Sequence, residues 1–240
     1  MSDCHPTLVQ VQHVSKTYRD HVDVQALRDV TLDLETGAFA AVVGPSGSGK
    51  STLLNLLGAL DRPNEGTIRI AGTDLGTTPP GELADFRLQQ IGFVFQAFNL
   101  LPVLSVQENL EFVANLQGMA KDKRHRRARA LLESVGLSEI WSKRPNELSG
   151  GQQQRVAVLR AIMTEPAIVL ADEPTANLDS ANAAILLDMM EQLNRDKGIT
   201  FLFSTHDPKV MERAHRLIRL RDGVVIADER DTQVSGAHLQ

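Results

Sequence analysis

Residues 44–52 read GPSGSGKST. They fit the pattern G-x-x-x-x-G-K-[ST], with Gly44, Gly49, Lys50 and Ser51 at the fixed positions. Glycines lack a Cβ and let backbone N–H groups converge on phosphate oxygens, and a helix that follows the loop points its positive end at the same oxygens. We therefore predict a phosphate-binding loop in which Lys50 neutralises the β- and γ-phosphates of a nucleotide and the Ser51 hydroxyl ligates Mg²⁺.

The sequence on either side of this loop has the strand and the helix that such a loop requires. Phe39–Val43 is a continuous apolar run, typical of a strand buried on both faces, and residues 51–60 have the spacing of a helix. The alternative is a glycine-serine turn that arose by chance, a roughly 1% event in a chain of this length. The other loop residues are also assigned to the nucleotide: Pro45, Ser46, Gly47, Ser48 and Thr52.

A second apolar run ends in two carboxylates. Residues 168–170 lead through Ala171 into Asp172 and Glu173. Taken alone, a strand that ends in Asp-Glu is more often a solvated boundary than a metal site, but a neighbouring phosphate-binding loop reverses that balance. Alternation along a strand aims the two side chains in different directions. We predict that Asp172 holds the Mg²⁺ shell and that Glu173 polarises an attacking water molecule.

The first third of the chain predicts antiparallel strands. Residues 8–14 and 27–34 alternate apolar and polar side chains, and residues 64–72 read as a turn followed by an edge strand.

The remainder predicts helices and further buried strands. Apolar spacing is helical from about residue 100 to residue 159, and buried strands over 168–171 and 200–204 flank a helix that contains 185–193. An Asp-Gly pair before residues 224–226 indicates a closing hairpin. Three residues punctuate the helical segment: Gly118, Gly136 and Pro145.

Composition and charge indicate an ordinary globular protein. Hydrophobic residues make up 42% and charged residues 23%, and the net charge of −5 gives no overall attraction to nucleic acid or to an acidic membrane. The single cysteine, Cys4, cannot form an intramolecular disulfide, which favours a reducing compartment. The basic run Lys121–Arg129 (KDKRHRRAR) has no interleaved aromatics and is interpreted as a solvated helix face. Without a secretory signal or an apolar run of membrane-spanning length, we expect a soluble, cytoplasmic protein that reaches a membrane only by docking.

Residues 148–155, LSGGQQQR, resemble the signature of the ATP-binding-cassette family. Ser149 is also a good N-cap for a helix that starts nearby. In that family the start of this helix binds the γ-phosphate held by the phosphate-binding loop of a second subunit. The resemblance therefore implies that Ser149, Gly150, Gly151 and Gln152 complete the site of a second copy, in a homodimer that ATP brings together.

Four further residues match positions of the family, and three of them have a plainer alternative. Tyr18, in SKTYRD, resembles the aromatic residue that stacks on adenine, although it is equally explained by strand packing. Gln96, in FVFQAF, resembles a glutamine that touches Mg²⁺ and the attacking water, and is otherwise a surface amide. Asp179, in TANLDS, resembles an aspartate that communicates across the dimer, and an isolated NLD is equally a helix cap. His206, in STHDP, resembles the histidine that contacts the γ-phosphate.

The fold that these observations predict is α/β. It has a P-loop NTPase core of the RecA-like kind, an N-terminal antiparallel β subdomain and an inserted α-helical subdomain. We assign residues 1–96 and 160–240 to the core with its β subdomain, and residues 97–159 to the helical subdomain, within a single domain of residues 1–240.

The resemblance also implies a membrane partner. Residues 98–110 (FNLLPVLSVQENL) are similar to bacterial cassettes of the lipoprotein-releasing and macrolide-exporting group, which pair with an integral membrane permease. Phe98–Leu104 falls where such cassettes accept a helix of the permease, although core packing explains its leucines nearly as well. We expect an ATPase at the cytoplasmic face of a bacterial inner membrane, coupled to a separate permease.

Two other kinds of cassette remain as alternatives. One is a regulatory cassette at the membrane, such as a cell-division cassette. The other is a soluble cassette acting on DNA or ribosomes. For DNA-repair cassettes, the 99 residues between Lys50 and Ser149 leave little room for an insertion, and ribosome-acting relatives usually carry two cassettes in one chain.

Overall fold

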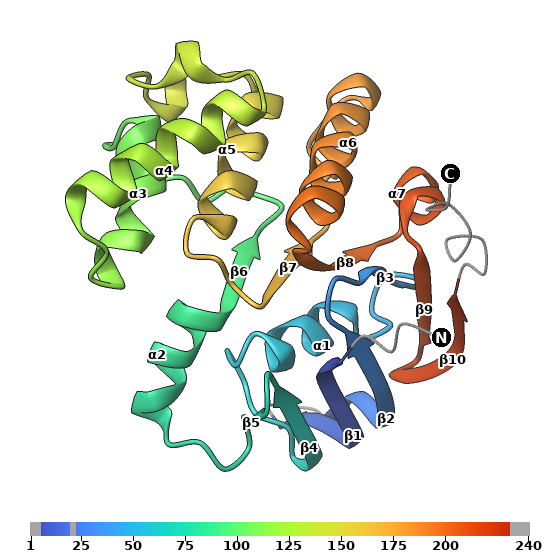
Figure 1. Cartoon of the computed structure of the whole chain (residues 1–240). Helices are drawn as coiled ribbons and strands as arrows, with labels where there is room; N and C mark the ends of the chain where they lie inside the picture. The colour runs from blue at the N-terminus through green and yellow to red at the C-terminus, as the bar shows by residue number, and fades with distance from the viewer. Residues whose placement is uncertain (1–5, 20–22, 231–240) are drawn as a thin grey trace, which may run out of the picture.

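Two β-sheets and a set of helices make up the part of the chain that the structure describes, residues 6–19 and 23–230 of a computed structural model (Figure 1). Cys4 lies outside these residues. A helix with the length and apolar character needed to cross a bilayer does not occur among the described residues.

An antiparallel sheet occupies one end of the molecule, as the alternating pattern of the first third predicts. Its strand order is β2-β1-β4-β5. The structure corrects one prediction, because residues 64–72 do not contain the edge strand: β4 pairs with β1 on one side and with the two-residue β5 on the other. The strands span Thr7–Arg19 (β1), Asp23–Glu35 (β2), Glu65–Ile70 (β4) and Thr73–Asp74 (β5).

A six-stranded sheet forms the centre of the molecule (Figure 1), in the order β10-β9-β3-β8-β7-β6. Strands β9, β3, β8, β7 and β6 run parallel, and only β10 is antiparallel, in the predicted closing hairpin with β9. The strands span Phe39–Val43 (β3), Ile91–Val94 (β6), Ile168–Asp172 (β7), Thr200–Thr205 (β8), Arg216–Arg221 (β9) and Val224–Arg230 (β10).

Helices alternate with the later strands along the chain, and α3, α4 and α5 lie together beyond the end of β6 (Figure 1). The helix after the phosphate-binding loop was predicted to reach residue 60 but ends at Leu57, and Gly58 forms its C-cap. Gly118 and Gly136 follow the ends of α3 and α4 with positive φ, and Pro145 opens a short 3₁₀ turn, so the predicted helix punctuation is confirmed. The helices span Lys50–Leu57 (α1), Pro80–Gln90 (α2), Val106–Leu116 (α3), Lys121–Ser134 (α4), Gly150–Ile162 (α5), Ser180–Lys197 (α6) and Pro208–Arg213 (α7), with 3₁₀ turns at Ser138–Ile140 (η1) and Pro145–Glu147 (η2).

The central sheet separates two apolar cores. Successive residues of β3 point to opposite faces, so Phe39 and Ala41 join the core formed with α3 to α6, whereas Ala40 and Val42 join the core formed with α1 and the antiparallel sheet. All five residues of β3 are buried, as its unbroken apolar run predicts. The strand that leads into the phosphate-binding loop is therefore fixed from both sides.

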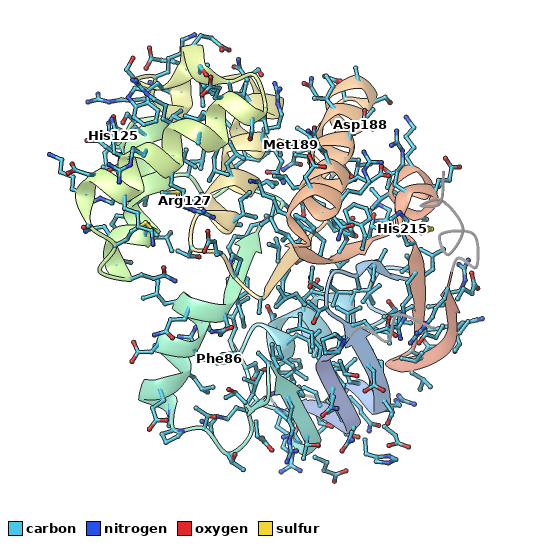
Figure 2. The ribbon with its side chains drawn as sticks, in the orientation of Figure 1. Phe86, His125, Arg127, Asp188, Met189 and His215 are labelled. Atoms are coloured by element: carbon cyan, nitrogen blue, oxygen red, sulfur yellow. The ribbon has the colours of Figure 1, made fainter. Side chains whose placement is uncertain are left out.

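The basic helix α4 is solvated on only part of its surface. Arg127 donates hydrogen bonds to the carbonyls of Ile162 and Met163 at the end of α5, and His125 lies against Glu111 of α3 (Figure 2). These residues fasten α4 to its neighbours. Four cations of the run are exposed, as predicted for a solvated face: Lys121, Lys123, Arg126 and Arg129.

An ion pair joins the two strands of the closing hairpin. Nε and Nη2 of the buried Arg216 donate to Oδ1 and Oδ2 of Asp228 at 2.8 and 2.6 Å. These hydrogen bonds hold the pKa of Asp228 below its usual value. Because the pKa is lower in the folded chain than in the unfolded chain, the pair stabilises the fold above the usual aspartate pKa, and this contribution disappears as the pH falls through the lowered value.

We expect Asp228→Asn to lower the free energy of unfolding at neutral pH by about 1–2 kcal/mol, since Asp228 is partly exposed and its pairing is partly screened. The difference from the wild type should vanish at acid pH. Urea denaturation at both pH values measures it. Glu229→Gln is the matched control, because its pairing with Arg219 is exposed on both sides; an equal effect of the two substitutions would contradict the prediction.

Candidate nucleotide site

The loop between β3 and α1 needs glycine at two positions. Gly49 has φ +103°, and a Cβ there would lie 2.5 Å from the carbonyl oxygen of Ala26. A Cβ on Gly44 would lie 2.1 Å from the carbonyl oxygen of Leu220. The loop is thus packed against β2 and β9 so closely that only glycines fit.

Lys50 is a buried cation inside this loop. Its side chain turns back so that Nζ donates to the carbonyls of Gly44 at 2.8 Å and Pro45 at 3.0 Å, and the residue is 8% exposed. Among the described residues, the buried Ser48 Oγ has no hydrogen-bond partner. An anionic oxygen at the start of this helix could accept a hydrogen bond from the buried ammonium and from the unpaired hydroxyl.

Asp172, at the end of β7, is held between two serines. The hydroxyl of Ser51 lies 3.3 Å from Asp172 Oδ1, and Ser204 of β8 donates a hydrogen bond to the same oxygen. Ser204 is fully buried and stands directly across from Asp172 in the parallel ladder. The sequence analysis did not assign Ser204, although a serine that directly follows the apolar run Phe201–Phe203 is a signal that marks it.

Glu173 leaves the strand in a left-handed conformation, with φ +46°. Its N–H donates to the Ser204 carbonyl at 3.1 Å, which holds this unfavourable backbone in place. Its Oε1 lies 2.8 Å from Nδ1 of the exposed His206. The two carboxylates do point in different directions, but the cause is this turn after the strand ends and not strand alternation alone.

One cleft of about 570 Å³ collects most of the predicted site residues. It lies where β3, β6, β7 and β8 end. Its lining includes Pro45, Ser46, Gly47, Gly49, Lys50, Ser51, Thr52, Gln96, Glu173 and His206.

Several predicted site residues do not line the cleft. Gly44, Ser48 and Asp172 are not part of the lining. Two of them contact residues that are: Gly44 accepts a hydrogen bond from Lys50, and Asp172 lies 3.3 Å from the Ser51 hydroxyl. Tyr18 is also absent from the lining, which includes instead its cross-strand partner Val24. The remaining ones belong to the signature helix and the turn before α6: Ser149, Gly150, Gly151, Gln152 and Asp179.

The signature starts α5 with a capping box. The Ser149 hydroxyl accepts from Gln152 N at 3.2 Å, and the Gln152 side chain accepts from Ser149 N at 3.0 Å. The helix start is therefore well ordered, as the predicted N-cap requires. Its serine is exposed at the surface and does not reach the cleft of its own chain.

Asp179 is the N-cap of α6. Its Oδ1 accepts from the backbone N–H of Asn182 at 2.9 Å and of Ala181 at 3.0 Å, and these bonds keep the pKa of Asp179 below its usual value. The Asn182 side chain donates to Asp179 Oδ2 at 2.7 Å. Asn182 also packs on the signature, because a Cβ on Gly151 would lie 2.3 Å from its Oδ1. Asn182, which the sequence analysis did not assign, therefore joins the signature to Asp179.

Comparison with known proteins identifies the family to which this chain belongs. A sequence model of the family described as ABC transporter matches residues 27–176. The chain belongs to the ABC transporter family. Its fold is that of the ATP-binding cassette: over 93% of this chain and 99% of the other, it superposes with a TM-score of 0.84 at 40% identity on a dimeric cassette, MJ0796, bound to ADP and phosphate.

Curated members of the ABC family resemble the chain over most of its length. It is 45% identical, over 91% of the chain, to the macrolide export ATP-binding/permease protein MacB of Syntrophobacter fumaroxidans. It is 43% identical, over 94% of the chain, to the pyoverdine export ATP-binding/permease protein PvdT of Pseudomonas aeruginosa. The chain spans about a third of the length of these two relatives, 31% and 34% respectively.

The contact between Gly151 and Asn182 predicts a specific double-mutant result. We expect Gly151→Ala to lower the free energy of unfolding by about 1–3 kcal/mol, because the added methyl group overlaps Asn182. In an Asn182→Ala background the same change should cost clearly less, because the two nearest atoms, Oδ1 and Cγ, are removed and only the Cβ at 3.0 Å remains.

Thermal or urea denaturation of the four proteins in the cycle measures this coupling. Gly150→Ala is the matched control, since its nearest neighbour, Phe98 Cζ, is 3.7 Å from the added Cβ. Equal destabilisation by Gly151→Ala in both backgrounds would show that Asn182 is not the obstacle.

Proposed function

We propose that this chain binds ATP with Mg²⁺ and hydrolyses it to ADP and phosphate, as the ATPase unit of an ABC transporter that drives a membrane permease. The observation that carries the proposal is the convergence of Lys50, Glu173 and His206 on one cleft with a phosphate-binding loop. A cassette with ADP and phosphate bound, 40% identical to this chain, supports the same chemistry.

Lys50 and the loop amides hold the phosphates. The ammonium is already desolvated, so its attraction for the β- and γ-phosphate oxygens is not weakened by competing water. The carbonyls that hold it in the loop are replaced by phosphate oxygens as the nucleotide enters. The buried Ser48 hydroxyl supplies a further hydrogen bond to an anionic oxygen.

The residues around Asp172 fit a magnesium ion. Ser51 and Asp172 bring two oxygen donors together, and Gln96 contributes a third from the same cleft. Oxygen donors with one carboxylate, completed by phosphate and water, are the set that Mg²⁺ prefers. When bound, the ion neutralises charge on the transferring phosphate.

Glu173 acts as the general base and His206 supports it. With its proton on Nδ1, His206 donates a hydrogen bond to the Glu173 carboxylate and keeps the proton; this fixes the carboxylate in the cleft and leaves Nε2 free to face the γ-phosphate. The carboxylate accepts the proton of the attacking water. The turn at Glu173 separates this role from that of Asp172, which stays beside Ser51.

Two copies of the chain are needed for two complete sites. Ser149 is exposed, and none of the signature residues lines the cleft of its own chain, so the start of α5 is free to meet the γ-phosphate held by a partner. Tyr18 stacks on adenine, and Asp179 communicates across the interface. The solved cassette of similar fold is a dimer, which supports ATP-dependent dimerisation here.

The permease docks beside residues 97–159, which we assign to a helical subdomain. A second cleft, of about 210 Å³, lies between α2, β6, α3 and α5. Phe98 and Asn99 are both left-handed, and the Arg160 side chain fixes them by donating to their two carbonyls. The apolar side chains exposed near this cleft offer a docking surface at the cytoplasmic face of the membrane: Leu101, Val103, Phe112 and Leu116.

Replacement of the general base separates binding from turnover. We expect Glu173→Gln to bind ATP, to hold the dimer together and to lose turnover by about 10²–10⁴-fold, because the amide keeps the shape but cannot accept the proton. Lys50→Ala should instead lose nucleotide binding itself. Nucleotide binding, phosphate release and light scattering with and without ATP measure these effects, and near-normal turnover of Glu173→Gln would remove its assignment as base.

The membrane partner is tested by a pull-down of tagged Glu173→Gln protein from its native membranes with Mg-ATP, followed by mass spectrometry. We expect an integral membrane permease in stoichiometric amount. A Leu101→Asp, Val103→Asp variant in the same background should recover less of it while still binding ATP. Recovery of only soluble proteins, ribosomes or DNA would contradict the transport assignment and leave the ATPase chemistry standing.

A further inference from the structure

Tyr18 lies against a charge pair, the buried Lys16 with the half-buried Asp61, that the proposed chemistry does not use. Lys16 and Tyr18 both belong to β1, and the contact between their side chains places them on the same side of the strand. The Lys16 ammonium lies over the Tyr18 ring, 5.0 Å from its centroid. Lys16 is 8% exposed and Tyr18 is 39% exposed, so one side of the ring meets a buried cation while part of the ring remains open to solvent.

The position of Lys16 is fixed by the loop after α1. Its Nζ donates to Asp61 Oδ1 at 2.7 Å and to the Arg62 carbonyl at 2.7 Å. Burial raises the pKa of Asp61, but the hydrogen bonds and the charge of its neighbours, first among them Lys16, together outweigh burial and keep the pKa below its usual value. Asp61 is therefore a carboxylate at neutral pH, and the ammonium is held by a charge and a carbonyl rather than by water.

The hydroxyl end of Tyr18 is near the same helix. Burial raises the pKa of Tyr18, the Thr52 hydroxyl lowers it, and the Asp61 carboxylate raises it further. Both neighbours belong to α1 or to the turn that follows it. Because α1 starts at Lys50, the ring is fastened to the element that begins at the phosphate-binding loop.

We propose that Lys16 and Asp61 position the ring of Tyr18 for stacking on adenine, and that the Lys16 ammonium strengthens the stack from behind the ring. The cation draws the π density of the ring toward itself, so the opposite face repels the π cloud of a purine less. Lys16 acts through Tyr18 and does not touch the nucleotide. The inference rests on the proposed function, because it takes the adenine to lie at Tyr18 and the phosphates at Lys50.

The test compares ATP with inorganic tripolyphosphate, which has the phosphates but no base. We expect Lys16→Met to weaken ATP binding about three- to five-fold, because only part of the cation–π energy is passed on to the adenine stack, and to raise the KM by the same factor. Tripolyphosphate binding and kcat should stay within about two-fold. Lys16→Arg keeps the cation and should restore most of the ATP affinity. Lys123→Met, an exposed lysine on α4, is the matched control and should change nothing.

A second measurement does not depend on nucleotide. Tyr18 is the only tyrosine of the chain, so the phenolate absorbance of the folded protein reports on this residue alone. Asp61→Asn removes a carboxylate that raises the pKa of Tyr18, so we expect its ionisation to move to lower pH and ATP affinity to fall relative to tripolyphosphate. An unchanged titration would show that Asp61 does not act on Tyr18 and would overturn the proposal. This result can be obtained even if Lys16→Met does not fold.

Tyr18→Ala distinguishes failure of this inference from failure of the adenine assignment. We expect it to weaken ATP binding about ten-fold or more and to leave tripolyphosphate binding intact, as the loss of a base stack requires. If Tyr18→Ala weakens ATP but Lys16→Met does not, or if Lys16→Met weakens both ligands equally, the positioning role of Lys16 is wrong. If Tyr18→Ala has no effect, the adenine lies elsewhere and the inference is overturned along with that assignment.

Discussion

The register of three parallel strands is the constraint on which the rest of the site depends. In the central sheet Val43 of β3 stands beside Thr205 of β8, and Asp172 of β7 stands beside Ser204 of β8. Parallel strands in register end at the same edge, so the residues that follow them meet there. The phosphate-binding loop, Glu173 and His206 are far apart in sequence, and this register alone brings them into one cleft.

The two apolar cores make that register difficult to change. A shift of one residue would move Phe39 of β3 from one core to the other, and the same holds for Phe201 and Phe203 of β8. The three rings pack edge-on or stacked with each other, with Phe39 and Phe203 centroids 4.7 Å apart. The position of Glu173, the proposed general base at the edge of the sheet, thus depends on aromatic packing in the core beneath it.

Local patterns predicted the elements whose signals lie within a few consecutive residues. The phosphate-binding loop with its strand and helix, the strand before Asp172 and the closing hairpin all belong to this class. The sequence analysis missed β6, which has only four residues, and α2, whose N-cap and first residue are both proline and which has little apolar periodicity. The wrong edge strand has a similar cause, because the true edge β5 is two residues long.

Features that depend on distant partners were beyond local patterns. The left-handed turn at Glu173 is fixed by Ser204, and the need for glycine at position 151 comes from Asn182. In each case the partner is some thirty residues further along the chain, and the local sequence does not show which residue it contacts.

Helix α5 connects the signature with the surface loop at Phe98 and Asn99. It starts at the signature and carries Arg160 close to its C-terminus, where the guanidinium holds the carbonyls of Phe98 and Asn99. An α-helix of this length is a stiff rod of about 20 Å, which changes its tilt more readily than its length. In the proposed dimer, contact of a second copy with the start of α5 would tilt the helix as a rigid body. The loop at Phe98 and Asn99, which Arg160 holds at the other end, would then move with it.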